Sequence, residues 1–144
     1  MELNKFVLTA GLTYTPQSMD AFIYLCEGLI ASATDDPGAR FFLKIAVDEF
    51  TVNAMEHAYK KQPGEITVSL IRKEKQITLE LSDQGHGVDL SKINLSREAR
   101  SLEDLKSRGW AFTILNRISN GLIIRPNKPQ GSIVSITLDV PLKD

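Results

Sequence analysis

The sequence predicts an α+β fold, a two-layer α/β sandwich with helices packed on one face of a mixed, mostly antiparallel sheet. Two long segments place apolar residues at helical spacing, and four shorter segments alternate apolar with polar residues, as strands with one buried face do. No internal repeat or low-complexity stretch interrupts them. With 144 residues, the chain is expected to form a single domain over residues 1–144 with its own hydrophobic core.

The first strand is predicted over residues 2–10. A helix then begins at Pro16 and stops in the turn at 34–38, which contains a proline followed by a glycine. Its apolar stripe is expected to consist of Phe22, Leu25, Leu29 and Ala33. A longer helix is predicted from about residue 39 to residue 59, with a core-facing stripe of Leu43, Val47, Phe50, Ala54 and Ala58.

The remaining strands are predicted from alternation, except for 122–124, which is a short apolar run. Segments 66–70 and 77–82 flank a polar turn and are predicted to form an antiparallel hairpin, and shorter strands are expected at 122–124 and 134–140. After the hairpin, residues 83–108 lose the pattern and carry nine charged residues from Asp89 onward. Such a long loop in a small domain is usually functional or mobile. Helical character resumes at 109–118.

Composition excludes several classes of function. Seventeen basic and eighteen acidic residues give a formal net charge of −1, and this balance gives no electrostatic case for nucleic acid as the main ligand, which would call for a concentrated basic face. A protein or a small molecule is therefore the expected ligand. No apolar run is long enough to cross a membrane and the N-terminus lacks the apolar core of a signal peptide, so a cytoplasmic protein is expected. The single cysteine, Cys26, lies among apolar residues and is expected to be a small buried hydrophobe.

The first candidate site lies on the longer helix. Glu49, Asn53 and His57 are spaced i, i+4 and i+8 and are expected along one side of that helix. An Asn oxygen is a hard, uncharged ligand suited to Mg²⁺ that is already bound to phosphates. A Glu one turn earlier could accept a proton from a water or hydroxyl near that metal. The alternative is a solvated polar helix face.

The second candidate site follows the hairpin, where Asp83, Gly85 and Gly87 form an Asp-x-Gly-x-Gly pattern. It places a carboxylate at a strand end, beside backbone that can approach a flat ligand closely. Such a carboxylate could accept a hydrogen bond from an exocyclic amine such as that of adenine. The alternative is a plain tight turn.

Two further candidates involve a glycine at the start of an element. Arg108 and Gly109 stand at a loop-to-helix junction, where backbone N–H groups and a nearby cation can bind phosphate. A plain helix start is the alternative. Gly131 and Ser132 open the last strand, and an ordinary turn is the default interpretation there.

Taken in order, these groups resemble the nucleotide-binding boxes of the Bergerat-fold (GHKL) ATPases. Residues 49–59 resemble the N box, Asp83-x-Gly85-x-Gly87 the first glycine box, Arg108-Gly109-x-Ala111 the second, and Gly131-Ser132-x-Val134 the closing element. The His57-Ala58-Tyr59 ending and the short length favour the anti-sigma-factor serine/threonine kinases of bacterial sporulation and stress responses.

The resemblance implies ATP and Mg²⁺ as cofactors and gives each matched residue a role. It implies Asn53 as the Mg²⁺ ligand, Glu49 as general base toward a partner's serine or threonine hydroxyl, and Asp83 as acceptor of the adenine amino hydrogen. Residues 89–108 would form a lid over the nucleotide. The other implied cofactor-binding residues are Gly85 and Gly87 beside the base, Lys106 or Arg108 toward the γ-phosphate, Gly109 at the phosphates, Ser132 acting through water, and His57.

The family also implies partners. The expected substrate is a small anti-anti-sigma (antagonist) protein, with a sigma factor as a second expected partner and homodimerisation through the N-terminal strand. Neither nucleic acid nor a membrane is expected. The alternatives are a switch kinase that controls a regulatory phosphatase, a nucleotide-dependent binding module without kinase activity, and a regulatory ATPase or sensor-kinase fragment. Trp110 and Ala111, which depart from the second glycine box, favour the binding module.

Overall fold

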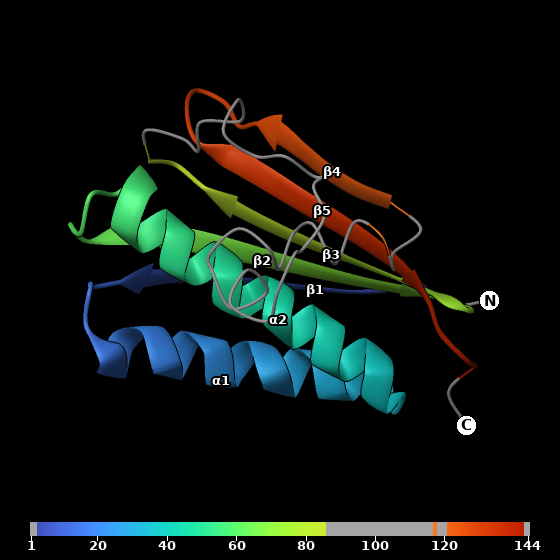
Figure 1. The fold of residues 1–144 in the computed structure, drawn as a ribbon. Coiled ribbons are helices and arrows are strands. Elements are labelled where there is room, and N and C mark those ends of the chain that lie inside the picture. Colours follow the sequence, from blue (N-terminus) through green and yellow to red (C-terminus); the bar gives the residue numbers. More distant parts are fainter. Residues whose placement is uncertain (1–2, 86–116, 118–120, 143–144) are drawn as a thin grey trace, which may run out of the picture.

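The computed structural model describes residues 3–85, 117 and 121–142. Five strands form one sheet in the order β1-β2-β3-β5-β4, and every described strand pair is antiparallel. Two helices, α1 and α2, lie side by side across one face of this sheet (Figure 1). The predicted two-layer α+β sandwich is therefore confirmed.

The sheet fixes which side chains face the helices. Its strands are β1 (Leu3–Leu12), β2 (Gly64–Lys73), β3 (Gln76–Asp83), β4 (Gly121–Pro126) and β5 (Ser132–Asp139). Burial alternates strictly along β2, β3 and β5, because one face is covered by the helices and the other is open. Asp83 pairs with Ile66 and shares the covered face with Leu81. Its carboxylate therefore lies on the helix side of the sheet.

Two side-chain hydrogen bonds stabilise the start of helix α1 (Pro16–Ala33). Thr15 Oγ1 accepts a hydrogen bond from the Ser18 amide at 3.2 Å, and Ser18 Oγ accepts one from the Thr13 amide at 2.9 Å. The buried stripe is Phe22, Cys26, Ile30 and Ala33. Leu25 was wrongly predicted in this stripe and is 53% exposed, because the i+4 spacing from Phe22 makes Cys26 the residue that faces the core.

Helix α2 (Pro37–Asn53) carries the second predicted stripe. Asp36 caps its start by accepting a hydrogen bond from the Ala39 amide at 2.9 Å. The predicted core residues Leu43, Val47, Phe50, Ala54 and Ala58 are all buried. The helix does not stay α-helical to residue 59, as predicted, but continues as the π-helical segment η1 (Ala54–Ala58), which ends with the Tyr59 amide bonded to the Ala54 carbonyl at 2.8 Å.

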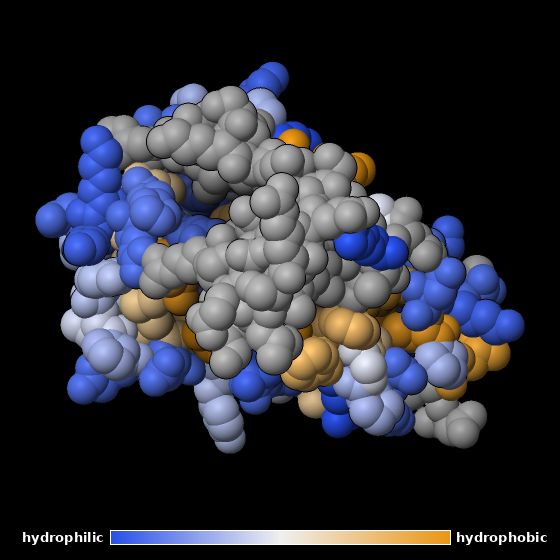
Figure 2. Space-filling view, viewed as in Figure 1, coloured by the Kyte–Doolittle hydropathy of each residue, from blue (hydrophilic) through white to orange (hydrophobic). Residues whose placement is uncertain are grey.

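The chain then leaves the helix through Lys60 and Lys61, both with positive φ. Hydrophilic side chains gather at this end of the molecule (Figure 2). None of the described helices is both long and apolar enough to cross a lipid bilayer. The predicted lid at 89–108 lies outside the described residues, and so does the predicted helix at 109–118 apart from Arg117.

Candidate functional site

The end of β3 lies directly against the end of η1. A Cβ placed on Gly85 would lie 2.5 Å from the Ala58 carbonyl oxygen and 2.8 Å from the Ala58 Cβ. Only glycine allows this approach without moving the helix backbone. The contact places the segment that follows Asp83 beside the same helix that carries the first candidate cluster.

Asp83 holds a buried acceptor that the described residues leave unused. The residue is 1% exposed, and its Oδ1 accepts a hydrogen bond from the Gly85 amide at 2.9 Å. Its Oδ2 is buried and accepts no hydrogen bond from the part of the chain that the structure describes. Burial raises the pKa of the Asp83 carboxyl, against the opposing effect of the backbone N–H groups of Gly85 and Ser132. A buried oxygen of this kind suits a ligand that donates a hydrogen bond, such as an amine.

The turn before β5 closes over the same strand end. Gly131 has a φ of +103°, and a Cβ on it would lie 2.0 Å from the Asp83 carbonyl oxygen. The next residue, Ser132, is buried, and its backbone N–H lowers the pKa of Asp83. The structure therefore brings the predicted pair Asp83 and Ser132 together.

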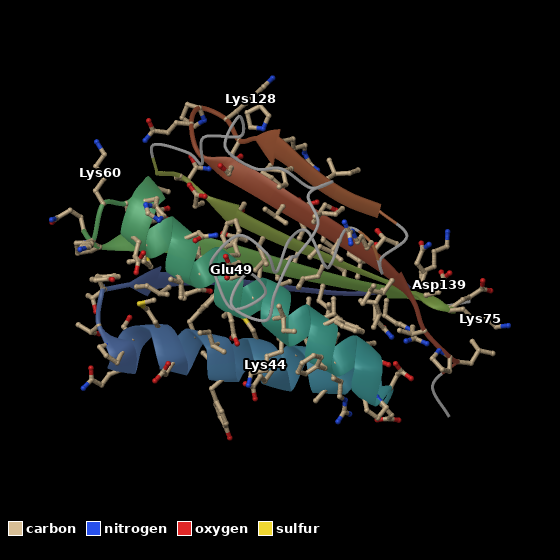
Figure 3. The ribbon with its side chains drawn as sticks, in the orientation of Figure 1. Lys44, Glu49, Lys60, Lys75, Lys128 and Asp139 are labelled. Atoms are coloured by element: carbon tan, nitrogen blue, oxygen red, sulfur yellow. The ribbon has the colours of Figure 1, made fainter. Side chains whose placement is uncertain are left out.

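Glu49 and Asn53 lie one turn apart toward the C-terminal end of α2, where Figure 3 labels Glu49. The Asn53 Nδ2 donates a hydrogen bond to Glu49 Oε1 at 3.3 Å. Both residues are half-buried. Since the amide nitrogen is used toward Glu49, the Asn53 oxygen is the atom suited to a metal ion.

His57 differs from the other two members of its cluster. It lies within η1, where the π-helical turn replaces the α-helical spacing that predicted it beside Asn53. Its side chain is 65% exposed, and its Nε2 lies 3.7 Å from Glu56 Oε2. Glu56 in turn accepts a hydrogen bond from the Tyr14 hydroxyl at 3.0 Å.

Four predicted site residues cannot be placed. Gly87, Lys106, Arg108 and Gly109 lie outside the described residues, and their roles stay predictions. Within the described ranges, no three His, Cys, Asp or Glu side chains gather as a metal site would require. A Mg²⁺ ion at Asn53 would therefore need phosphate oxygens and water to complete its octahedral shell.

Sequence patterns indicate no site role for Tyr59, Asn127 or Gln130, which all contact the backbone at the end of β3 or just after it. The Tyr59 hydroxyl accepts a hydrogen bond from the Gln84 amide at 2.8 Å. Asn127 Nδ2 donates to the Asp83 carbonyl, and Gln130 Nε2 to the Gln84 carbonyl, both at 2.9 Å. In the sequence, residues 126–129 had only the composition of a turn.

Comparison with known proteins identifies related chains. Residues 14–138 match the family model described as the histidine kinase-like ATPase domain. The anti-sigma F factor of Clostridium acetobutylicum is 26% identical over 90 residues, which cover 62% of this chain and 63% of that protein. This chain thus spans a little under two thirds of that relative's length. The resemblance to the anti-sigma-factor branch of the GHKL ATPases is confirmed.

A second relative and a solved structure cover more of the chain. The anti-sigma F factor of Thermoanaerobacter sp. (strain X514) is 25% identical over 138 residues, which cover 95% of this chain and 91% of that protein. A chain in the crystal structure of the SiaB–SiaC complex from Pseudomonas aeruginosa matches with a TM-score of 0.58 and 14% identity, over 92% of this chain and 89% of that one. This structural likeness bears on the fold alone.

Proposed function

This chain belongs to the histidine kinase-like ATPase domain family, and from that premise we propose that it is an ATP-dependent serine/threonine protein kinase of the anti-sigma-factor type. Family membership makes it an ATP-binding protein. Its substrate in this proposal is a small anti-anti-sigma protein, and a sigma factor is a second partner. The similarity to anti-sigma F factors supports this choice.

One observation carries the proposal. The helix that bears Glu49 and Asn53 packs, at its far end, against the segment that follows Asp83, whose buried Oδ2 has no donor among the described residues. A carboxylate so placed would accept the exocyclic amine of adenine, with Ser132 assisting through water. Asn53 would then provide an oxygen ligand toward Mg²⁺ and the phosphates.

The residues divide the work of phosphoryl transfer. When bound, Mg²⁺ neutralises charge on the phosphates, so the protein has mainly to position the reactants. Glu49 would orient a serine or threonine hydroxyl of the partner and take its proton. Gly85 and Gly87 would allow the backbone to approach the base closely. In this proposal the phosphates are bound by Lys106, Arg108 and Gly109, and residues 89–108 form a lid over them. His57 lies at the edge of the nucleotide site.

Homodimerisation is part of the same proposal. Strand β1 lies at an edge of the sheet, so one side of its backbone is open for pairing with a second chain. The proposed contact uses this edge and leaves the helix face of each copy accessible.

The decisive experiment measures binding and transfer separately. Isothermal titration calorimetry with ATP, with and without Mg²⁺, tests the nucleotide site. Incubation with γ-³²P-labelled ATP and a small anti-anti-sigma protein tests transfer to serine or threonine. Tight Mg²⁺-dependent ATP binding without any labelling would favour the nucleotide-dependent binding module. Absence of ATP binding would refute the proposal.

A further inference from the structure

Side chains from two other parts of the chain hold the backbone just beyond β3. The Asp83 carbonyl accepts a hydrogen bond from Asn127 Nδ2 at 2.9 Å. The Gln84 amide donates to the Tyr59 hydroxyl at 2.8 Å, and the Gln84 carbonyl accepts from Gln130 Nε2 at 2.9 Å. Consecutive polar groups of one short segment are thus fixed from the helix side by Tyr59 and from the β4–β5 turn by Asn127 and Gln130.

Hydrogen bonding alone does not require the two contacts to Gln84. Gln84 is exposed, so water could satisfy its backbone groups, whereas Asp83 is buried and its carbonyl needs a donor from the chain, which Asn127 provides. Holding Tyr59 and Gln130 in single rotamers costs conformational entropy that water would not. What the side chains add is a fixed position for the peptide groups on either side of the Asp83 carboxylate.

Tyr59 joins this segment to the helix. Its hydroxyl donates a hydrogen bond to the Glu65 carbonyl in β2 while it accepts the one from Gln84. Its ring lies over Gly64, where a Cβ would come within 2.4 Å of ring atoms. Burial raises the pKa of the Tyr59 hydroxyl, which therefore keeps its proton at neutral pH.

Tyr59 and Asn127 reach the backbone at and after Asp83 from the same end of the sheet. Figure 3 shows Lys60, next to Tyr59, and Lys128, next to Asn127, toward one end of the sheet, and Lys75 and Asp139 toward the other. The contacts also bridge large sequence separations, 25 residues for Tyr59 with Gln84 and 44 for Asn127 with Asp83. They therefore form only when helix, sheet and turn are assembled.

We propose that Tyr59 and Asn127 are positioning residues for base recognition: they hold the backbone around Asp83 so that its Oδ2 faces the exocyclic amine of the nucleotide. The inference rests on the proposed function, because it requires Asp83 to bind the base. Neither side chain touches the nucleotide in this scheme. Tyr59 also sets the position of the base-binding segment relative to the helix that carries Glu49 and Asn53.

The test uses the full chain with Tyr59→Phe, which keeps the ring over Gly64 and removes only the hydroxyl. Tyr24→Phe is the matched control, since Tyr24 is 75% exposed on α1. Hydrogen exchange at the Gln84 amide, followed by NMR without nucleotide, reports directly on the contact. Calorimetry with ATP and with GTP then reports on base recognition.

In Tyr59→Phe we expect exchange at Gln84 to accelerate and the ATP affinity to fall about fivefold to tenfold, the equivalent of one hydrogen bond. The affinity for GTP, which lacks the adenine amine, should fall less, so the preference for ATP over GTP should become smaller. Asn127→Ala should narrow the same preference, and it provides a second variant should Tyr59→Phe fold poorly. Tyr24→Phe should leave both measurements unchanged.

Two outcomes overturn the inference, and they can be told apart. In the first outcome, the wild type prefers ATP over GTP, and both variants either keep this preference or lose affinity for ATP and GTP equally. Tyr59 and Asn127 are then merely structural, and the proposed function stands. If the wild type itself binds no ATP, the proposed function fails and base positioning fails with it, whatever the exchange rate at Gln84.

Discussion

The side-chain amide of Asn53 donates a hydrogen bond to the carboxylate of Glu49, one helical turn earlier on α2, across 3.3 Å. This bond couples the proposed metal ligand to the proposed base. It uses the nitrogen of Asn53 and leaves the oxygen for a metal ion. It also holds the Glu49 carboxylate in a defined place, which a general base requires.

Replacing Asn53 by alanine should abolish Mg²⁺-dependent ATP binding. We expect the affinity for Mg²⁺–ATP to fall at least about tenfold, because even residues that only support a metal ligand cost that much when they are lost. Calorimetry in Mg²⁺ and in EDTA measures the metal-dependent part. Asn4→Ala, on exposed β1, is the control. An unchanged Mg²⁺ dependence in Asn53→Ala would remove Asn53 from the metal site.

Glu49→Gln should separate binding from transfer. Glutamine still accepts the hydrogen bond from Asn53 but cannot take a proton, so ATP affinity should stay near that of the wild type. Transfer of labelled γ-phosphate to the antagonist protein should slow by roughly 10²- to 10⁴-fold. Glu74→Gln, in the exposed turn between β2 and β3, is the matched control. Normal labelling by Glu49→Gln would mean that another group acts as the base.

Asp83→Asn should weaken ATP binding by about 1–3 kcal/mol, because a buried acceptor becomes a donor that faces another donor. The Gly85 amide bonds Oδ1 and would keep the asparagine oxygen there, which leaves the new NH₂ group at the position of Oδ2. Competition calorimetry with ATP and GTP measures the change. Asp139→Asn, exposed at the end of β5, should bind like the wild type. Equal binding of ATP and GTP by the wild type would refute the adenine role.

Much of this site follows from local sequence patterns. The alternation that ends at Asp83 located a carboxylate at a strand end, and the apolar stripe of α2 placed Glu49 and Asn53 on its flank. The π-helical turn left no such signal, because Ala54 and Ala58 fit both helical periods. The contacts of Tyr59 and Asn127 depend on side chains that meet only in the folded chain, so local pattern cannot predict them.

Asp48 should make stability depend on pH. Its pKa is raised chiefly by burial, with Lys44 lowering it and Glu27, Asp20 and Glu49 raising it, and its buried Oδ1 has no hydrogen-bond partner among the described residues. The pKa of Asp48 is therefore higher in the folded than in the unfolded chain. At a pH above the folded-state pKa, the charged carboxylate destabilises the fold by its full amount, and this destabilisation disappears as the pH falls toward the unfolded-state pKa.

Asp48→Asn should therefore raise the free energy of unfolding at pH 7, by less than about 1 kcal/mol because the side chain is only half-buried. In urea denaturation at pH 7 and pH 5, the free energy of unfolding of Asp48→Asn should change less with pH than that of the wild type. Asp83 contributes a shift of the same direction, so some dependence should remain. Destabilisation at pH 7 would show that the charged form of Asp48 is stabilised after all.

Two glycine-to-alanine changes should have opposite effects on stability. At Gly28, within α1, a Cβ meets nothing within 4 Å, so alanine should stabilise the fold by about 0.5–1 kcal/mol through its better helix propensity. At Gly85 the Cβ would lie 2.5 Å from the Ala58 carbonyl oxygen, which belongs to backbone and cannot rotate away. Gly85→Ala should therefore destabilise by about 1–3 kcal/mol and weaken ATP binding, because the segment after Asp83 must move off η1. Urea unfolding and ATP calorimetry on both variants test this, and a Gly85→Ala protein as stable as the wild type would mean that β3 does not end against the helix.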